Sequence, residues 1–161
     1  KESRSNLEPI GEWYFPVWLI DHERQAIWEF ALDQLARHRW TGLGANTINL
    51  VEGADAIIPF TNDTHVMPSH PHNWILEILV ETGIIGLLAY VSLIFLALRR
   101  LIGSYRRTRN LATLSVVATS GGYLVSGMFN FSFWASWWQL SFYIICAMAL
   151  ASAASTDQSR Q

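Results

Sequence analysis

The sequence is poor in charged residues and contains a single cysteine. Asp, Glu, Lys and Arg make up 15% of its 161 residues, whereas soluble domains carry about 25%. None of these four residue types occurs between Asn110 and Thr156. Cys146 stands alone, which excludes an intrachain disulfide and a cysteine-based metal framework. Basic residues are not interleaved with aromatic ones outside one short segment, so nucleic acid is not an expected partner.

Apolar residues are abundant instead, at 51% of the chain. The uncharged block 110–156 offers room for two helical spans of about 20 residues each. A third apolar run covers residues 74–98, with its two acids, Glu77 and Glu81, near its start. We therefore expect an all-α membrane protein, with a helical loop segment followed by three transmembrane helices.

Arginines set the expected orientation of these helices. Five arginines and no acidic residue lie in residues 99–110, which the positive-inside rule assigns to the cytoplasm. The chain opens on Lys1 with no signal-type apolar core, so we expect upstream helices of the same protein in a bacterial inner membrane, surrounded by membrane lipids. The predicted arrangement is a periplasmic segment at 1–73, transmembrane helices at 74–98 and 111–131, a periplasmic aromatic turn and third helix at 132–153, and a cytoplasmic tail at 154–161.

The predicted periplasmic segment contains one clear helix. Residues 21–39 form an amphipathic pattern that begins with Asp21, a good N-cap. Gly42 and Gly44 end this helix. Three further stretches have weaker signals, namely an interfacial segment at 10–20, a short helix within 45–60 and a polar loop at 61–72.

Histidines gather where this loop meets the first transmembrane helix, at positions 65, 70 and 72. If the helix begins near Trp74, Asn73 is its N-cap and His72 lies at the positive end of the helix dipole. That field favours a neutral imidazole, the form that a general base requires. The free N–H groups at the same helix end also suit a phosphate.

Plainer interpretations of these residues stay open. His72 and Asn73 could serve only to cap the helix, and His65, His70 and His72 could close on zinc, although we predict no metal. Glu77, one turn beyond Asn73, could orient the histidine or extend towards the membrane surface.

Arg24 is a second candidate, because it occupies the first turn of the helix at 21–39, where the dipole disfavours a cation. It is either a ligand for an anion or a solvated partner of Asp21 or Glu23. The glycines at 83, 86, 121 and 122 are expected to permit close helix packing. The tryptophans at 134, 137 and 138 are expected to form an interfacial belt.

Two patterns resemble those of the O-antigen ligase family, which also includes O-antigen polymerases and protein O-oligosaccharyltransferases. His72-Asn73, nine residues and then Gly83-Ile84-Ile85-Gly86 resembles the family signature of His-Asn, nine residues and Gly-x-x-Gly. Upstream, Arg24-x-x-x-Trp28 followed by Gly42-Leu43-Gly44 resembles the family's periplasmic loop. The resemblance covers roughly residues 21 to 90 and suggests a C-terminal fragment of a larger GT-C-like polytopic fold.

The resemblance implies a glycosyltransferase that uses no cofactor. Its donor would be a glycan on undecaprenyl pyrophosphate, and its acceptor would be a hydroxyl at the periplasmic face. The favoured acceptor is lipid A-core. The resemblance makes His72 the general base and Arg24 the pyrophosphate ligand, with His70, Asn73 and Glu77 at the substrate site.

Four alternatives remain. Two are O-antigen polymerase and protein O-oligosaccharyltransferase, which differ in the acceptor. The third is a component of an inorganic-carbon transporter, and the fourth is a structural anchor with a receptor-like periplasmic domain. A transporter should carry ionisable groups within its spans, and the last two predicted spans have none.

Overall fold

The computed structural model describes residues 15–16, 18–58, 61, 63–129 and 131–158. Their elements, in chain order, are helices α1 (His22–His38), the 3-10 helix η2 (Ile48–Leu50), α2 (Trp74–Thr108), α3 (Leu111–Gly127) and α4 (Ser136–Gln158). These residues form no strand, only an isolated bridge between Ile57 and His65. The predicted all-α class is confirmed for this part of the chain.

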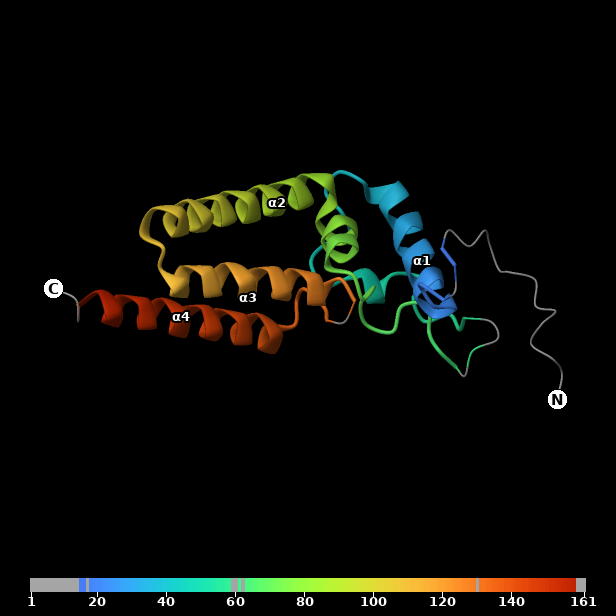
Figure 1. The fold of residues 1–161 in the computed structure, drawn as a ribbon. Coiled ribbons are helices and arrows are strands. Elements are labelled where there is room, and N and C mark those ends of the chain that lie inside the picture. The colour runs from blue at the N-terminus through green and yellow to red at the C-terminus, as the bar shows by residue number, and fades with distance from the viewer. Residues whose placement is uncertain (1–14, 17, 59–60, 62, 130, 159–161) are drawn as a thin grey trace.

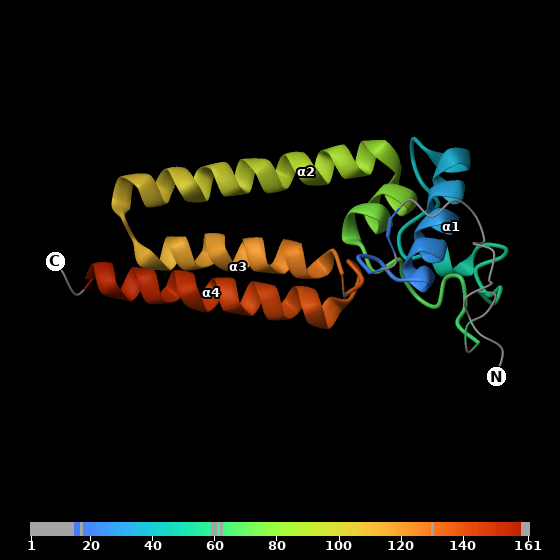
Figure 2. The same cartoon turned by 45° about the vertical axis from the view of Figure 1, so that its right-hand side comes forward.

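The molecule has two regions, visible in Figure 1. One contains α1, η2 and the connecting loops. The other contains three long helices, in which α3 packs against both α2 and α4. Figure 2, turned by 45°, again shows α1 and its loops at one end of the long helices.

Helix α1 begins and ends close to the predicted bounds of 21–39. The Asp21 side chain caps it by accepting a hydrogen bond of 2.8 Å from the Arg24 amide. The buried Gln25 side chain donates to the carbonyls of Phe15 and Ile20 and so fixes the chain that enters the helix. Of the predicted interfacial segment 10–20, residues 10–14 and 17 lie outside the described residues.

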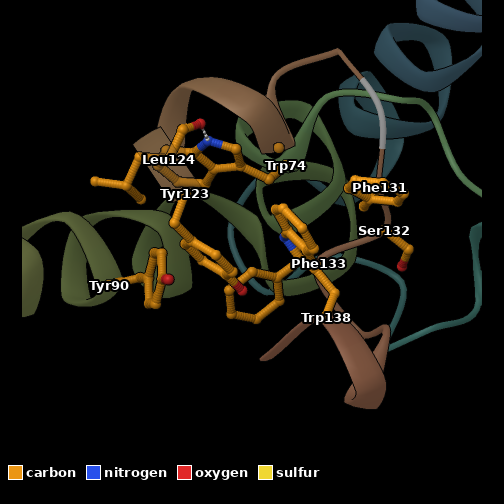
Figure 3. A pocket seen from close by; sticks show the side chains of 9 residues that line it. Trp74, Tyr90, Tyr123, Leu124, Phe131, Ser132, Phe133 and Trp138 are labelled. Atoms are coloured by element: carbon orange, nitrogen blue, oxygen red, sulfur yellow. Dashed lines mark hydrogen bonds between the residues drawn. The ribbon is translucent and has the colours of Figure 1, made fainter. Parts of the chain in front are cut away.

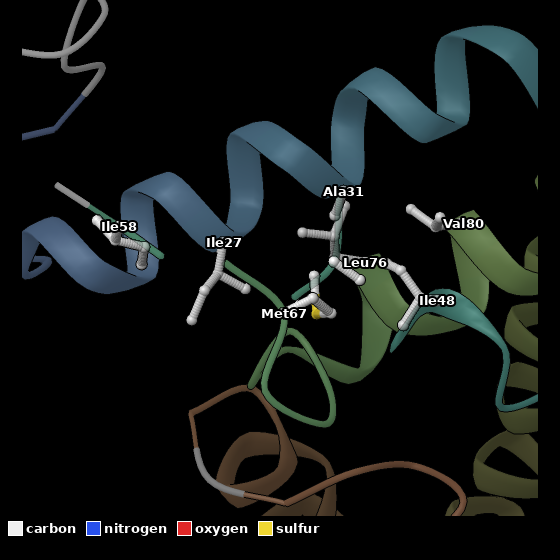
Figure 4. Close-up of a cluster of buried hydrophobic side chains, with 8 residues drawn as sticks. Ile27, Ala31, Ile48, Ile58, Met67, Leu76 and Val80 are labelled. Carbon is white, nitrogen blue, oxygen red and sulfur yellow. The ribbon is translucent and has the colours of Figure 1, made fainter. Parts of the chain in front are cut away.

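A small hydrophobic core joins α1 to the loops and to the start of α2 (Figure 4). Helix α1 supplies Ile27 and Ala31, and α2 supplies Leu76 and Val80. The intervening chain adds the other members of the cluster, Ile48, Ala54, Ile58 and Met67. Burial of a large aliphatic side chain contributes about 1.5–3 kcal/mol, so this cluster fixes α1 on the first turns of α2.

Helix α2 differs from its prediction in two ways. First, it is interrupted at Gly83, whose backbone has φ 70° and ψ −176°. We call residues 74–82 the short arm and residues 84–108 the long arm. Second, the helix continues to Thr108, so the prediction of a loop at 99–110 was wrong for most of its length. Arginine is a good helix former, and only Arg109, in a left-handed conformation, and Asn110 form the turn.

The bounds of the last two helices also differ from those predicted. Helix α3 ends at Gly127 rather than near residue 131. Helix α4 begins at Ser136, so Trp137 and Trp138 lie in its first turn and not in the preceding connection. It continues to Gln158 rather than ending at residue 153.

Among the described residues, α2 is long and apolar enough to cross a membrane, and α3 is a shorter apolar helix. The long arm of α2 carries large apolar side chains that are exposed, including Ile85, Leu88, Leu93 and Phe95. One membrane span is thus supported by length and composition. Three spans and their orientation stay predictions.

Candidate functional site

The polar loop meets α2 at His72 and Asn73. Asn73 is the N-cap, as predicted, and its side-chain oxygen accepts hydrogen bonds from the amides of Ile75 (3.1 Å) and Leu76 (3.3 Å). His72 has a left-handed backbone with φ 51°, which is uncommon for a residue other than glycine. Its ring lies 4.3 Å from that of His70, centroid to centroid. The cap thus presents two adjacent imidazoles at the helix terminus.

His70 has a second contact, a 2.8 Å hydrogen bond between its Nδ1 and the Ser69 hydroxyl. His65 uses its Nδ1 for a 2.7 Å contact with the Asp55 carbonyl, next to the isolated bridge. In the part of the chain that the structure describes, no three His, Cys, Asp or Glu side chains are grouped so as to hold a metal ion. The zinc alternative for the three histidines therefore has no geometric support.

Helix α1 is tied directly to the histidine loop. The indole N–H of Trp28 donates a 2.9 Å hydrogen bond to the carbonyl of Pro71, which immediately precedes His72. Pro71 itself is fully buried. Arg24 is one turn before Trp28 on the same helix face, about 6 Å between Cβ atoms. The structure thus brings together the Arg-x-x-x-Trp and His-Asn patterns, which are far apart in sequence.

The Arg24 side chain forms an exposed ion pair with Asp21, with 3.4 Å between Nε and the carboxylate. This is one of the two pairings that the sequence suggested. Exposed pairs of this kind contribute about 0–1 kcal/mol, so the guanidinium can exchange Asp21 for another anion at little cost.

The Gly42–Gly44 turn interlocks with the break in α2. Interruption of the helix at Gly83 leaves carbonyls and amides without helical partners, and residues 39–44 supply them. Leu43 and Gly44 donate to the carbonyls of Val80 and Glu81, at 3.0 and 2.9 Å, and the Ile84 amide donates to the Arg39 carbonyl at 2.9 Å. The two segments approach so closely that both need glycine.

Two glycines make this approach possible, Gly42 with φ 70° and Gly83 with φ 70°. A Cβ on Gly83 would collide with the Trp40 carbonyl, and one on Gly42 would collide with the backbone of Glu81. The close packing predicted for Gly83 is therefore against a turn and not against a helix. Gly121 and Gly122 have open space where a side chain would lie, so nothing in the described chain packs closely on them.

Glu81 is a buried carboxylate that the sequence analysis did not single out. It is 1% exposed, and both oxygens accept hydrogen bonds. One accepts from the amides of Thr47 (2.9 Å) and Ile48 (3.1 Å), and the other from the Asn46 amide (2.6 Å) and the indole of Trp134. Glu81 therefore caps η2 and joins it to the connection between α3 and α4.

Glu77 occupies a similar position one turn earlier. It is 1% exposed, so the interpretation in which it extends to the membrane surface was wrong. Its oxygens accept hydrogen bonds from the Ser132 hydroxyl (2.5 Å) and the Phe133 amide (2.7 Å). Two acids at the start of an apolar helix were the available signal, since buried charges require hydrogen-bond partners.

The connection held by these acids forms part of an aromatic cluster (Figure 3). Trp74 donates to the Leu124 carbonyl at 2.8 Å, and Tyr90 packs edge-on against Trp74 and Phe133. A small apolar pocket here is lined by these groups and by Tyr123, Gly127, Phe131, Ser132 and Trp138. Trp134 is half-buried and donates to Glu81, whereas Trp137 is 59% exposed, and the interfacial belt stays a prediction.

Comparison with known proteins identifies the segment that contains this site. Residues 18–91 match the family model described as O-antigen ligase. Candidate polysaccharide ligases from Rickettsia are similar over most of the chain. That of R. conorii is 29% identical over 136 residues, 82% of this chain and 32% of the relative. Those of R. prowazekii and R. bellii are 30% and 31% identical, over 88% and 90% of this chain.

The chain spans about a third of the length of the curated relatives that it matches. No solved structure matches it.

Proposed function

We propose that this chain, whose residues 18–91 match the family model described as O-antigen ligase, provides the catalytic loop of a membrane glycosyltransferase. The enzyme moves a glycan from undecaprenyl pyrophosphate to an acceptor hydroxyl at the periplasmic face of a bacterial inner membrane. Among the possible acceptors, we favour lipid A-core. Residues 1–73 face the periplasm, α2, α3 and α4 each form one span, and the upstream helices of the same protein complete the site.

The proposed reaction assigns one role to each of two side chains. A ring nitrogen of His72 takes the proton of the acceptor hydroxyl as its oxygen attacks the anomeric carbon. The bond from that carbon to the donor phosphate breaks, and its electron pair leaves with undecaprenyl pyrophosphate. Arg24 releases Asp21 and stabilises the charge that develops on the departing phosphate.

The observation that carries this proposal is the Trp28–Pro71 hydrogen bond. It holds the face of α1 that bears Arg24 against the loop that ends in His72. A phosphate ligand and a base on adjacent elements are the arrangement that transfer from a pyrophosphate requires, because catalysis then depends mainly on the relative position of donor and acceptor.

Neighbouring residues support these two. His70 packs beside the His72 ring, and Asn73 fixes the start of the helix that follows both histidines. Glu77 acts indirectly, because its oxygens accept from Ser132 and Phe133. Its role is to hold the connection between α3 and α4 beside the short arm.

The test uses the full-length protein in cells that lack their own O-antigen ligase. Wild type, His72→Ala and Arg24→Ala are expressed at matched levels, with Arg24→Lys as a variant that retains the charge. We expect wild type to restore the lipopolysaccharide ladder on gels and both alanine variants to abolish it. Arg24→Lys should retain part of the activity, because lysine also binds phosphate, but as a point charge.

Other outcomes identify the alternatives. Glycosylated protein or longer free glycan, without a ladder, would assign the polymerase or protein O-oligosaccharyltransferase activity. A ladder that is unchanged by His72→Ala would contradict the general-base role and leave His72 as part of the cap. Uptake of inorganic carbon without any glycan product would favour the transporter alternative.

A further inference from the structure

A basic surface at the end of α1 has no role in the proposed reaction. It consists of Arg37, His38, Arg39 and Trp40, and we call it the basic shoulder. All four side chains are exposed, and the Arg39 guanidinium lies 5.8 Å from the centre of the Trp40 ring. Together with Ala36 and Thr41 they line an open groove. Within the described residues, neither arginine has an ion-pair partner.

The basic shoulder lies at the bend of α2. The Arg39 carbonyl accepts from the Ile84 amide at 2.9 Å, and the Trp40 carbonyl accepts from the Ile85 amide at 3.4 Å. In Figures 1 and 2 the chain that leaves α1 runs beside this bend. Apolar surface begins immediately beyond it, since Ile85 is 60% and Leu88 61% exposed on the long arm.

This position corresponds to the headgroup layer if the long arm enters the membrane at the bend. Tryptophan is enriched at that depth, and arginine can place its charged end among phosphates while its stem covers apolar surface. Arg37 follows Arg24 by 13 residues on one helix, which is about 20 Å along its axis. A phosphate at the basic shoulder would therefore be a different one from the donor phosphate assigned to Arg24.

We propose that the basic shoulder binds the headgroup phosphate of an anionic phospholipid in the leaflet nearest α1. The lipid contacts Arg37 and Arg39 with its phosphate, and the Trp40 ring lies at the boundary of its acyl chains. Binding there fixes the height of α1 above the bilayer. This inference depends on entry of α2 into the membrane at Gly83 and not on the chemistry proposed for His72.

The test measures lipid proximity at the basic shoulder in the full chain reconstituted into phosphatidylcholine nanodiscs. Thr41→Cys, in a Cys146→Ser background, carries a bimane fluorophore. Phosphatidylglycerol or phosphatidylcholine, each with the same nitroxide near the headgroup end of an acyl chain, is added at equal fraction. We expect phosphatidylglycerol to quench about fivefold more effectively at low salt, and the preference to fall as ionic strength rises.

Matched variants show which arginines cause the preference for phosphatidylglycerol. In Arg37→Gln/Arg39→Gln the two lipids should quench equally, and Arg37→Lys/Arg39→Lys should retain the preference. Arg106→Gln/Arg107→Gln removes the same charge at the far end of the long arm and should change nothing at position 41. The proposal is overturned if neither lipid quenches, if both quench equally in wild type, or if the far-end variant removes the preference as fully as the shoulder variant. Circular dichroism of each variant verifies that the helices are intact.

Discussion

The two regions of this molecule are held together by different forces. The region around α1 has a buried core, two buried carboxylates with every oxygen hydrogen-bonded, and a backbone interlock between residues 39–44 and the bend of α2. The long helices pack on one another through α3, with aromatic contacts such as Tyr123–Trp138 near one end, and expose apolar side chains along their length. Specific polar contacts thus fix the candidate site, whereas the long helices leave much of their apolar surface uncovered by the described residues.

The largest expected difference in stability between the two regions comes from substituting glycine where the backbones touch at the bend of α2. Gly83→Ala should lower the free energy of unfolding by about 3 kcal/mol or more, because its φ is positive and its Cβ would meet the Trp40 carbonyl. Gly122→Ala is the matched control on α3, where a side chain meets open space and alanine is the better helix former. Thermal unfolding in detergent should show a loss for the first variant and none for the second. Equal effects would contradict the interlock.

The two buried acids should respond differently to the same substitution. Both oxygens of Glu81 face N–H donors, so either orientation of a glutamine places its NH2 against a donor. Glu81→Gln should cost about 2–3 kcal/mol. In Glu77→Gln the amide oxygen can accept from Phe133, and the NH2 can donate to the Ser132 hydroxyl, so the loss should stay below about 1 kcal/mol.

Denaturant unfolding of the two glutamine variants, with exposed Glu29→Gln as control, measures this difference. Similar losses of stability at positions 77 and 81 would contradict this account. They would show that the four N–H donors around Glu81 do not require a carboxylate there.

The link between α1 and the histidine loop should have a smaller effect on stability than on activity. Trp28→Phe removes the hydrogen bond to Pro71 and leaves an aromatic ring in the core, at a cost of about 1 kcal/mol. Glycan transfer should fall by a larger factor, because small displacements of a positioned group reduce rates strongly. Transfer and thermal stability are measured on the same preparations. Activity that falls only in proportion to folded protein would remove the positioning role of Trp28.

Local signals predicted much of this structure from the sequence. Asp21 and Asn73 mark helix starts, and each side chain caps its own first turn. Such interactions involve residues two or three positions apart, so the sequence pattern contains both partners. His70 and His72, whose rings contact each other, are likewise only two positions apart.

Features that depend on distant partners could not be predicted in the same way. Glu77 binds residues 55 and 56 positions later, and Glu81 binds residues 33 to 35 positions earlier and Trp134, 53 positions later. The bend at Gly83 likewise forms because residues 39–44 satisfy the groups that it exposes. The hydrogen bonds of these two acids, and the interruption of α2 at Gly83, therefore become visible only in the three-dimensional structure.

His72→Gly separates chemistry from capping most directly. Glycine adopts the left-handed backbone of residue 72 without strain, and this gain offsets part of the lost contact with the His70 ring, so the stability should stay within about 1 kcal/mol of wild type. Asn73 keeps its cap in that variant. The decisive measurement is therefore the lipopolysaccharide ladder formed by full-length His72→Gly in cells without their own ligase. The account predicts a folded, normally abundant protein and no ladder. A ladder equal to that of wild type would contradict the assignment of His72 as the base.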